Sequence, residues 1–293
     1  MSKKIIAVVL AALVAVIGFV FVACNNGGEK PSSSTPDSSS ADSSSSADSS
    51  SSADSSSSAD SASDLAYVKG KGTLVIGITD YAPMNYKEEG SDKWTGFDTE
   101  YAEAVCKKLG VEPQFVVLAD WGAKANELKS KAIDAVWNGM TITDDLKTSM
   151  DITNAYVVNQ QVIVCKKADS EKFAAADSIK DAKIAVEGGG VAEGLVADYK
   201  NVTSCKDQAA ALLEVKTGAA DVAVIDMTMA KTLTADGASY SDLAYTAELS
   251  NEEYGIGFRK GSDLCGEVNK ITEELKADGT LKALAEKYKL TLA

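Results

Sequence analysis

TLVIGIT at residues 73–79 and GFDTEYAEAVCKKLG at residues 96–110 are the two stretches that decide the fold of this chain. The first is a short run rich in β-branched residues, which predicts a buried strand. The second has apolar side chains at helical spacing, namely Phe97, Tyr101, Ala104, Val105 and Leu109. Gly110 then ends the expected helix. A strand followed by an amphipathic helix is the repeating unit of a parallel sheet that is covered by helices.

The same alternation continues to the end of the chain. Further strands are expected over residues 114–118, 133–137, 162–165, 183–186, 220–225 and 255–258. Helices are expected over residues 123–131, 192–199 and 207–216, and over residues 264–288 with a break near Gly279. Because the pattern starts again after a first set of elements, the predicted fold class is α/β with two lobes.

The composition excludes several classes of function. The 293 residues carry 29 Lys and Arg against 43 Asp and Glu, a formal net charge of -14, which opposes binding to phosphate backbones. We therefore expect no nucleic-acid partner. The chain has no histidine, which excludes Ser-His-Asp and Cys-His catalysis and a His-ligated zinc site. No metal and no other cofactor is expected.

The N-terminus has the pattern of an export signal. Lys3 and Lys4 precede an apolar run over residues 5–23, which Cys24 closes. FVAC at residues 21–24 resembles the lipobox of bacterial lipoproteins, with Phe21 where that motif usually has Leu. The resemblance implies a signal peptide over residues 1–23 and a diacylglyceryl lipid on Cys24 that anchors the chain to the cell membrane. The run is also long enough for an uncleaved membrane span, and both alternatives place the rest of the chain outside the cytoplasm.

Residues 24–66 are expected to form a disordered tether. From Pro31 to Asp60 the chain repeats Ser, Ala and Asp, with nothing apolar to bury. Such a segment connects the lipid anchor to the globular part and has no fold of its own.

Four more cysteines lie in the globular part. Cys106 and Cys165 fit a helix face and a strand and are expected to be buried, while Cys205 and Cys265 are expected in loops or at helix starts. Their spacing allows one disulfide and does not identify it.

A set of ordered motifs gives the globular part a resemblance to a known family. They are YAPM at 81–84, WTGFD at 94–98, IDAVWNGMTIT at 133–143, ADVAVID at 220–226, YGIGFRKG at 254–261 and ELKADGTL at 274–281. In this order and spacing they resemble, over residues 69–290, the amino-acid-binding family of periplasmic-type solute receptors that feed ABC importers, known as family 3.

The resemblance implies a type II periplasmic-binding-protein fold, in which two α/β lobes are joined by two crossover strands. Lobe 1 would comprise residues 67–161 and 250–293, and lobe 2 residues 162–249. A small ligand, an amino acid or an amine-like solute, would bind in the cleft on which the lobes close. The expected partner is an ABC permease in the membrane, and the expected protein is a monomer without enzymatic activity.

The family's ligand-binding positions fall on particular residues of this chain. Asp226, at the carboxyl end of an expected strand, matches the acceptor for the α-ammonium group. Tyr81 and Trp121 match aromatic residues that cover the ligand, with packing inside a lobe as the alternative for both. Gly139 and Thr141 match positions that offer a backbone carbonyl and a hydroxyl. A zwitterion in a closed cleft needs a partner for each charge, because burying an unpaired charge costs several kcal/mol.

The chain departs from the family where the ligand's α-carboxylate is bound. The usual arginine is replaced by Leu146, and the only arginine of the chain, Arg259, lies in a segment that resembles lobe 1 framework. The usual hydroxyl residue is replaced by glycines at 188–190. Their backbone N–H groups, that of Gly190 included, can still hold an anion at a helix start.

Two explanations of these losses stay open. Either the ligand is a cation or an amine that suits nearby acids, or the chain is a drifted paralogue that binds amino acids weakly. The acids are Asp226, Glu187, Asp80, Asp144 and Asp145. Asp144 and Asp145 also suit the first turn of a helix without any ligand.

Two other functions also stay open. One is an enzyme on the same fold, since the fold also resembles that of cyclohexadienyl dehydratases, with Glu187 as the only obvious general acid. The other is an extracellular sensor lipoprotein that takes no part in transport.

Overall fold

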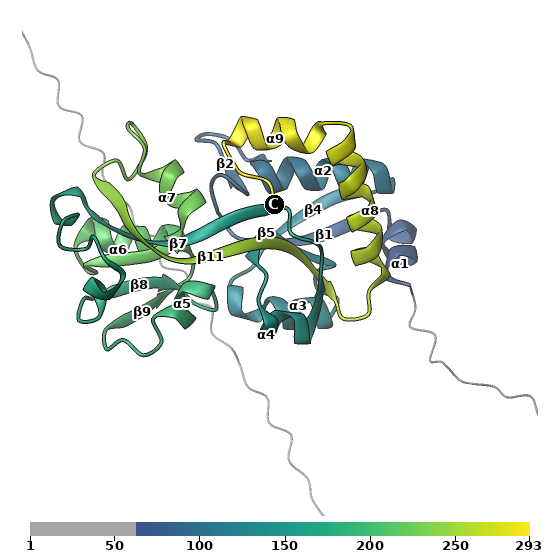
Figure 1. Ribbon diagram of the computed structural model, residues 1–293. Helices are drawn as coiled ribbons and strands as arrows, with labels where there is room; N and C mark the ends of the chain where they lie inside the picture. The colour runs from purple at the N-terminus through teal and green to yellow at the C-terminus, as the bar shows by residue number, and fades with distance from the viewer. Residues whose placement is uncertain (1–62) are drawn as a thin grey trace, which may run out of the picture. The chain divides into compact units, whose positions relative to one another are not determined.

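The computed structural model describes residues 63–293. The signal peptide, Cys24 and most of the predicted tether lie outside the described residues. The described residues form a mixed α/β fold with two lobes, as predicted (Figure 1). Among them, no helix combines the length and the apolar character needed to cross a bilayer.

The first lobe takes its elements from both ends of the described chain. The N-terminal ones are α1 (Asp64–Lys71), β1 (Thr73–Ile78), β2 (Tyr86–Lys87), β3 (Trp94–Thr95), α2 (Phe97–Leu109), β4 (Glu112–Val117), the 3-10 helix η1 (Trp121–Ala123), α3 (Lys124–Lys129), β5 (Ala135–Thr141), α4 (Asp144–Ser149) and β6 (Met150–Ile152). The C-terminal ones are α8 (Asp263–Ala277), α9 (Thr280–Tyr288) and the end of β11 (Leu243–Arg259), a strand that enters from the second lobe.

The second lobe is a single stretch of chain. Its elements are β7 (Val157–Lys166), the 3-10 helices η2 (Lys167–Asp169) and η3 (Ala176–Ile179), β8 (Ile184–Glu187), α5 (Val191–Leu195), β9 (Val202–Cys205), α6 (Gln208–Thr217), β10 (Val222–Asp226) and α7 (Met227–Leu233).

One nine-stranded sheet runs through both lobes in the order β4-β1-β5-β11-β7-β10-β8-β9, with β6 paired to β11 outside this path. β1 is parallel to β4 and β5, and β8 is parallel to β9 and β10. β7 and β11 pair antiparallel from Leu243 opposite Lys166 to Tyr254 opposite Val157, and they connect the two lobes. The boundaries expected for the lobes stay predictions, because both strands pass from one lobe into the other without a break.

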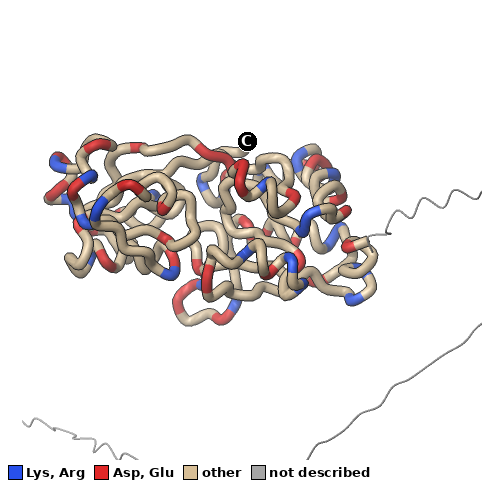
Figure 2. Tube along the Cα trace, turned by 90° about the horizontal axis from the view of Figure 1, so that it is seen from below, with Lys and Arg blue, Asp and Glu red and all other residues tan. Residues whose placement is uncertain are grey.

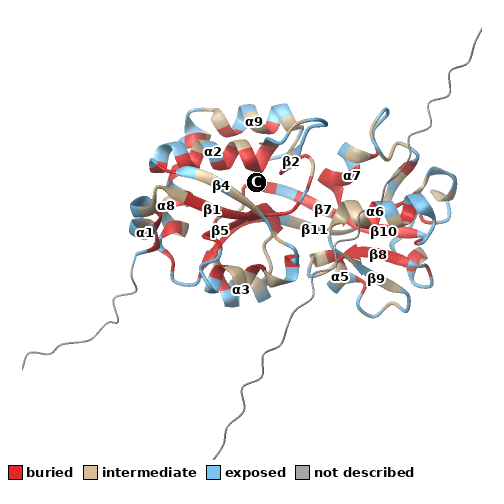
Figure 3. Cartoon of the chain, turned by 180° about the vertical axis from the view of Figure 1, so that it is seen from behind, coloured by how far each residue is buried: buried red, intermediate tan, exposed pale blue. Residues whose placement is uncertain are grey.

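Helices pack on both faces of the sheet in the first lobe. α2, α8 and α9 contact one another on one side of β1 and β5, and α3 and α4 lie on the other side (Figure 1). Buried residues run through β1 and β5, and exposed residues lie on the outer turns of the helices (Figure 3). The edge of the Tyr101 ring meets Trp137 of β5, with centroids 4.7 Å apart. This packing fixes β5, whose last residues reach the cleft between the lobes.

Several sequence predictions are confirmed. β1 and α2 lie where 73–79 and 96–110 placed them, and α2 ends at Gly110. α6 starts directly after Asp207, whose side chain caps the helix by accepting the N–H of Ala210 at 2.7 Å. The final helical stretch is broken at Gly279, as predicted.

Other predictions were wrong in detail. The strand predicted over 133–137 is β5, which begins at Ala135 and continues to Thr141. The helix predicted over 192–199 is the short α5, whose sequence contains Gly194, a poor helix former. β9 and α7 were not predicted at all.

The predicted tether also ends too late, since its last residues are part of the fold. Asp64 begins α1, and its buried carboxylate accepts the Nε–H of Arg259 at 2.8 Å. The N–H of Leu65 donates to Asp263 at 2.9 Å. A composition rich in Ser, Ala and Asp cannot reveal partners that lie almost 200 residues further along the chain.

The four cysteines of the described residues are free thiols. Cys106 and Cys165 are buried, as predicted, and burial raises the pKa of both. Cys265 lies in the first turn of α8, as predicted, whereas Cys205 ends β9.

Charged residues of both signs are interspersed over the two lobes (Figure 2). Some pair across helices, such as Lys108 with Glu274 at 3.1 Å and Lys287 with Glu100 at 2.6 Å. Exposed pairs of this kind contribute about 0–1 kcal/mol each. Charges that select a ligand therefore have to be sought in the cleft, where water is excluded.

Candidate functional site

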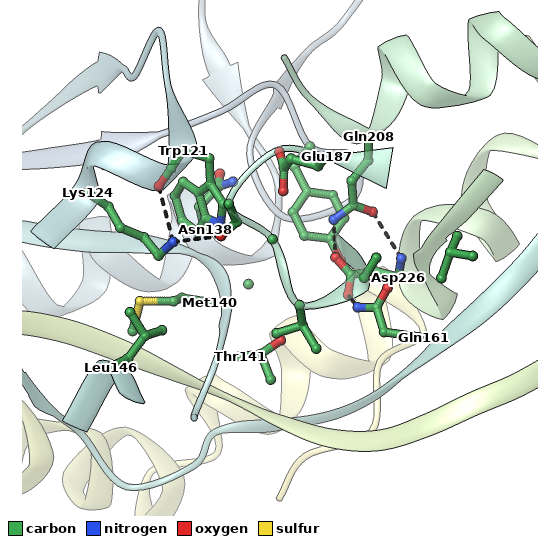
Figure 4. A pocket seen from close by; sticks show the side chains of 17 residues that line it. Trp121, Lys124, Asn138, Met140, Thr141, Leu146, Gln161, Glu187, Gln208 and Asp226 are labelled. Carbon is green, nitrogen blue, oxygen red and sulfur yellow. Dashed lines mark hydrogen bonds between the residues drawn. The ribbon is translucent and has the colours of Figure 1, made fainter. Parts of the chain in front are cut away.

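The six predicted site residues come together around one cavity between the lobes. They are Tyr81, Trp121, Gly139, Thr141, Gly190 and Asp226. The cavity has a free volume of about 40 Å³, and residues of both lobes line it (Figure 4). That these six residues bind a ligand stays a prediction.

Asp226 lies at the end of β10 and is 3% exposed. Its carboxylate accepts Nδ2–H of Asn159 at 2.7 Å, Nε2–H of Gln161 at 2.6 Å, and Nε2–H of Gln208. Among residues 63–293, no lysine or arginine nitrogen lies within 4.0 Å of this carboxylate. Three neutral amides therefore hold the buried carboxyl group in place, and none of them carries a charge that would repel a cationic ligand group.

These amides were missed by reasoning from sequence. Asn159 and Gln161 are two residues apart on β7, so both side chains project from the same face toward β10. That spacing was the available signal. Gln208 gave no signal, because the first residue of a helix is usually exposed.

A second acid, Glu187, stands at the end of β8 and is 6% exposed. Burial raises the pKa of Glu187 to about 8, with the Asp226 charge adding to the rise and the Lys124 charge opposing it. Glu252 of β11 accepts the amides of Asn159 and Gln161, and burial together with Asp226 raises its pKa as well. Asp226 thus has no lysine or arginine beside it among the described residues, while its two acidic neighbours, Glu187 and Glu252, both have a raised pKa.

The raised pKa of Glu187 makes stability depend on pH. Because this pKa lies above the unfolded value of 4.5, the folded protein holds a proton between pH 4.5 and 8 that the unfolded chain has lost. The stabilisation is complete below pH 4.5 and is lost as pH rises through about 8. The side chain of the Glu187→Gln variant cannot ionise. As pH rises from 4.5 to 8, the free energy of unfolding of this variant should therefore increase relative to that of the native protein by up to about 1.4 kcal/mol per pH unit.

Urea denaturation of both proteins at pH 5, 6, 7 and 8 measures this difference. Glu193→Gln is the matched control, because the Glu193 side chain lies close by and its hydrogen bonds to Ser204 and Gly189 lower its pKa. The difference in free energy of unfolding between Glu193→Gln and the native protein should stay constant over this pH range. Parallel curves for Glu187→Gln and the native protein would contradict a raised pKa.

Tyr81 forms part of the cavity wall on the first-lobe side. Its buried hydroxyl lies 2.5 Å from Oγ1 of Thr228 in α7 and 2.6 Å from the hydroxyl of Tyr254. Gly139 has a φ of 57°, and a Cβ there would lie 2.6 Å from Cε1 of Tyr81. The N–H of Gly139 donates to Asp98 at 2.7 Å. Only glycine satisfies this backbone conformation and this approach to the ring.

Trp121 and Lys124, also of the first lobe, form another part of the wall. Trp121 is buried in η1, and Lys124 begins α3. The Nζ of Lys124 donates to the carbonyls of Trp121 and Gly189, both at 3.1 Å, and lies 4.7 Å from the centre of the Trp121 ring. Lys124 was not predicted, because a lysine in the first turn of an amphipathic helix normally faces solvent.

The predicted anion site at residues 188–190 is corrected by the structure. The N–H groups of Gly188, Gly189 and Gly190 donate to the Cys205 carbonyl, the Glu193 side chain and the Glu187 carbonyl at 2.9, 2.8 and 3.2 Å. They close a turn and are already occupied. Gly189 also approaches the first lobe, since a Cβ at Gly189 would lie 2.4 Å from Cα of Gly122.

Leu146 lies at the cavity and Arg259 does not. Leu146 of α4 lines the cavity, and its N–H is capped by Thr143 at 3.2 Å. Arg259 is buried elsewhere in the first lobe, with Asp64 and Asp134 as ion-pair partners. Arg259 is therefore framework, as predicted.

Comparison with known proteins gives concordant matches. A model of the bacterial extracellular solute-binding proteins, family 3, matches residues 74–291. The L-cystine-binding protein TcyJ of Escherichia coli strain K12 is 33% identical over 235 residues, covering 75% of this chain and 84% of TcyJ. The arginine-binding extracellular protein ArtP of Bacillus subtilis strain 168 is 33% identical over 234 residues, covering 75% of this chain and 87% of ArtP.

A solved structure matches over the same region. The crystal structure of the ancestral amino acid-binding protein AncCDT-1, a precursor of cyclohexadienyl dehydratase, is similar with a TM-score of 0.71 and 30% sequence identity. The match covers 77% of this chain and 99% of that one.

Proposed function

The chain belongs to the bacterial extracellular solute-binding proteins of family 3, and from this premise we propose that it captures an amino acid or a related amine for an ABC importer. The observation that carries the proposal is the Asp226 carboxylate, which is buried in the cleft and accepts hydrogen bonds from three neutral amides. The names of TcyJ and ArtP, which bind cystine and arginine, support the ligand class.

The two lobes supply different parts of the proposed site. Asp226 would accept the ammonium group of the ligand. The rings of Tyr81 and Trp121 would cover its carbon chain, and Gly139 and Thr141 would offer a carbonyl and a hydroxyl. Because these groups come from both lobes, the ligand binds the closed arrangement better than an open one and so favours closure.

A thermal-shift screen of the purified full-length protein in detergent micelles tests the proposal. The ligands are the standard amino acids, cystine and a set of polyamines. A ligand at 100 times its dissociation constant should add about 2.7 kcal/mol to the free energy of unfolding. Stabilisation by polyamines alone would shift the ligand class to amines, and no stabilisation by any compound would reject the proposal.

The proposed location is the outer face of the cell membrane, with the chain anchored as a monomer through a lipid on Cys24. The lipobox-like stretch at residues 21–24 supports this anchor, and Cys24 lies outside the described residues. Cells grown with labelled palmitate should label the native chain and leave Cys24→Ala unlabelled. Equal labelling of both would reject the anchor.

Glu187 favours a second candidate, a dehydratase-type enzyme. A carboxyl group with a pKa of about 8 is largely protonated at pH 7, which a general acid requires. AncCDT-1, described as a precursor of such an enzyme, is similar in structure. Release of an aromatic product from a cyclohexadienyl substrate, lost in Glu187→Gln, would establish it, and absence of turnover in the native protein would reject it.

A further inference from the structure

Lys124 is a buried lysine that lines the cavity. It is 5% exposed, and its Nζ donates to two backbone carbonyls. Among residues 63–293, no carboxylate oxygen lies within 4.0 Å of this Nζ. The other deeply buried cation, Arg259, has both Asp64 and Asp134 as partners at 2.8 and 3.2 Å. The structure therefore leaves the charge of Lys124 uncompensated by contact.

The ammonium group of Lys124 has a hydrogen-bond donor to spare. Lysine carries three N–H donors, and the carbonyls of Trp121 and Gly189 accept two of them. Burial lowers the pKa of Lys124, while the charges of Glu187 and Asp120 oppose that effect. The carboxylate of a ligand placed beside Nζ would supply the counter-charge that burial has taken from the ammonium group.

The positions of the charges suit one class of ligand. Lys124 and Leu146 lie on one side of the cavity, and Asp226 with Gln161 and Gln208 lies on the other (Figure 4). A cation at one side and an anion at the other match a zwitterion that spans the cavity. Leu146, which stands where the family has arginine, adds only apolar surface beside Lys124.

We infer that Nζ of Lys124 binds the carboxylate of the ligand, in place of the arginine that Leu146 replaces. The inference rests on the proposed function and names the ligand class more closely, as an amino acid with a free carboxylate. Because Lys124 also donates to Gly189 of the second lobe, carboxylate binding takes place where the lobes meet.

Two pairs of ligands separate this role from a purely structural one. Agmatine is arginine without its carboxylate, and cystamine is cystine without both carboxylates. Titration calorimetry on the full-length protein in detergent micelles, with all four compounds, compares the native protein with Lys124→Met. Lys129→Met is the matched control, because Lys129 lies on the same helix and is exposed.

Lys124→Met should weaken binding of the amino acid of each pair that the native protein binds by about 10- to 150-fold, and binding of its amine by less than about 3-fold. Lys129→Met should change neither. Lys124→Arg, which keeps the charge, should retain the preference for the amino acid. In the double variant Lys124→Met with Leu146→Arg, the preference for the amino acid over the amine should return, because residues 124 and 146 line the same part of the cavity.

Other results overturn the inference. Equal losses for amino acid and amine would mean that Lys124 only ties the lobes together. Binding of amines alone by the native protein would overturn the carboxylate role and leave a solute-binding function intact. Binding of none of the four compounds, nor of any in the thermal-shift screen, would reject the proposed function and the inference with it.

Discussion

Asp226→Asn is expected to weaken ligand binding by about 30-fold to several thousand-fold, the largest effect of any substitution in the cleft. Removing one charge of a buried, hydrogen-bonded charge pair costs about 2–5 kcal/mol, because the ligand's ammonium group is then buried without a counter-charge. Asparagine fills the same volume and can still exchange hydrogen bonds with Asn159, Gln161 and Gln208. The fold should therefore persist while affinity is lost.

Titration calorimetry with the ligand found by screening measures this change. Asp242→Asn is the control, since it makes the same substitution on the second lobe at a side chain that is 56% exposed and does not line the cavity. Its affinity should match that of the native protein. A loss below about 3-fold for Asp226→Asn would show that Asp226 does not face the ligand's charge.

Arg259→Met is expected to destabilise the protein by about 3–5 kcal/mol, the cost of breaking a buried ion pair by removing one partner. The Arg259 guanidinium donates to the carboxylates of Asp64 and Asp134, and its Nη1 also donates to the carbonyls of Ile133 and Leu128 at 2.7 and 3.3 Å. Methionine removes all of these bonds. Asp134 then keeps Lys71 and the N–H of Val75 as partners, and Asp64 keeps Lys131 at 3.8 Å.

Urea denaturation compares Arg259→Met with Lys260→Met, the next residue, whose side chain is 58% exposed. The control should lose less than about 1 kcal/mol, as exposed pairs do. A similarly small loss for Arg259→Met would mean that Arg259 does not hold the first lobe together. Ligand affinity measured well below the unfolding transition should be unchanged, because Arg259 lies outside the cavity.

The elements that could be predicted from sequence are those with a strong local pattern. β1 and α2 follow from a β-branched run and from helical spacing closed by Gly110. The position of Asp226 follows similarly, because a carboxylate directly after an apolar strand lies at the edge of the sheet where ligands bind. These signals extend over a few residues and need no knowledge of distant contacts.

The features that could not be predicted depend on partners far away in the chain. From the sequence pattern Lys124 is an exposed helix residue, whereas in the structure it is buried and donates to Gly189 of the other lobe. The N–H groups at 188–190 read as open until Cys205 and Glu193 occupy two of them. Asp64 reads as part of a tether until Arg259 binds it. In each case tertiary contact overrides a correct local description.

The contact between Gly189 and Gly122 sets a limit on how far the lobes can close. Backbone meets backbone there, so the smallest added side chain would act as a wedge and raise the free energy of the closed arrangement. Because observed affinity falls with the fraction of molecules able to close, residue size at Gly189 would change how tightly the solute is retained. The affinity of such a receptor can thus be matched to a scarce or an abundant solute by the size of one residue.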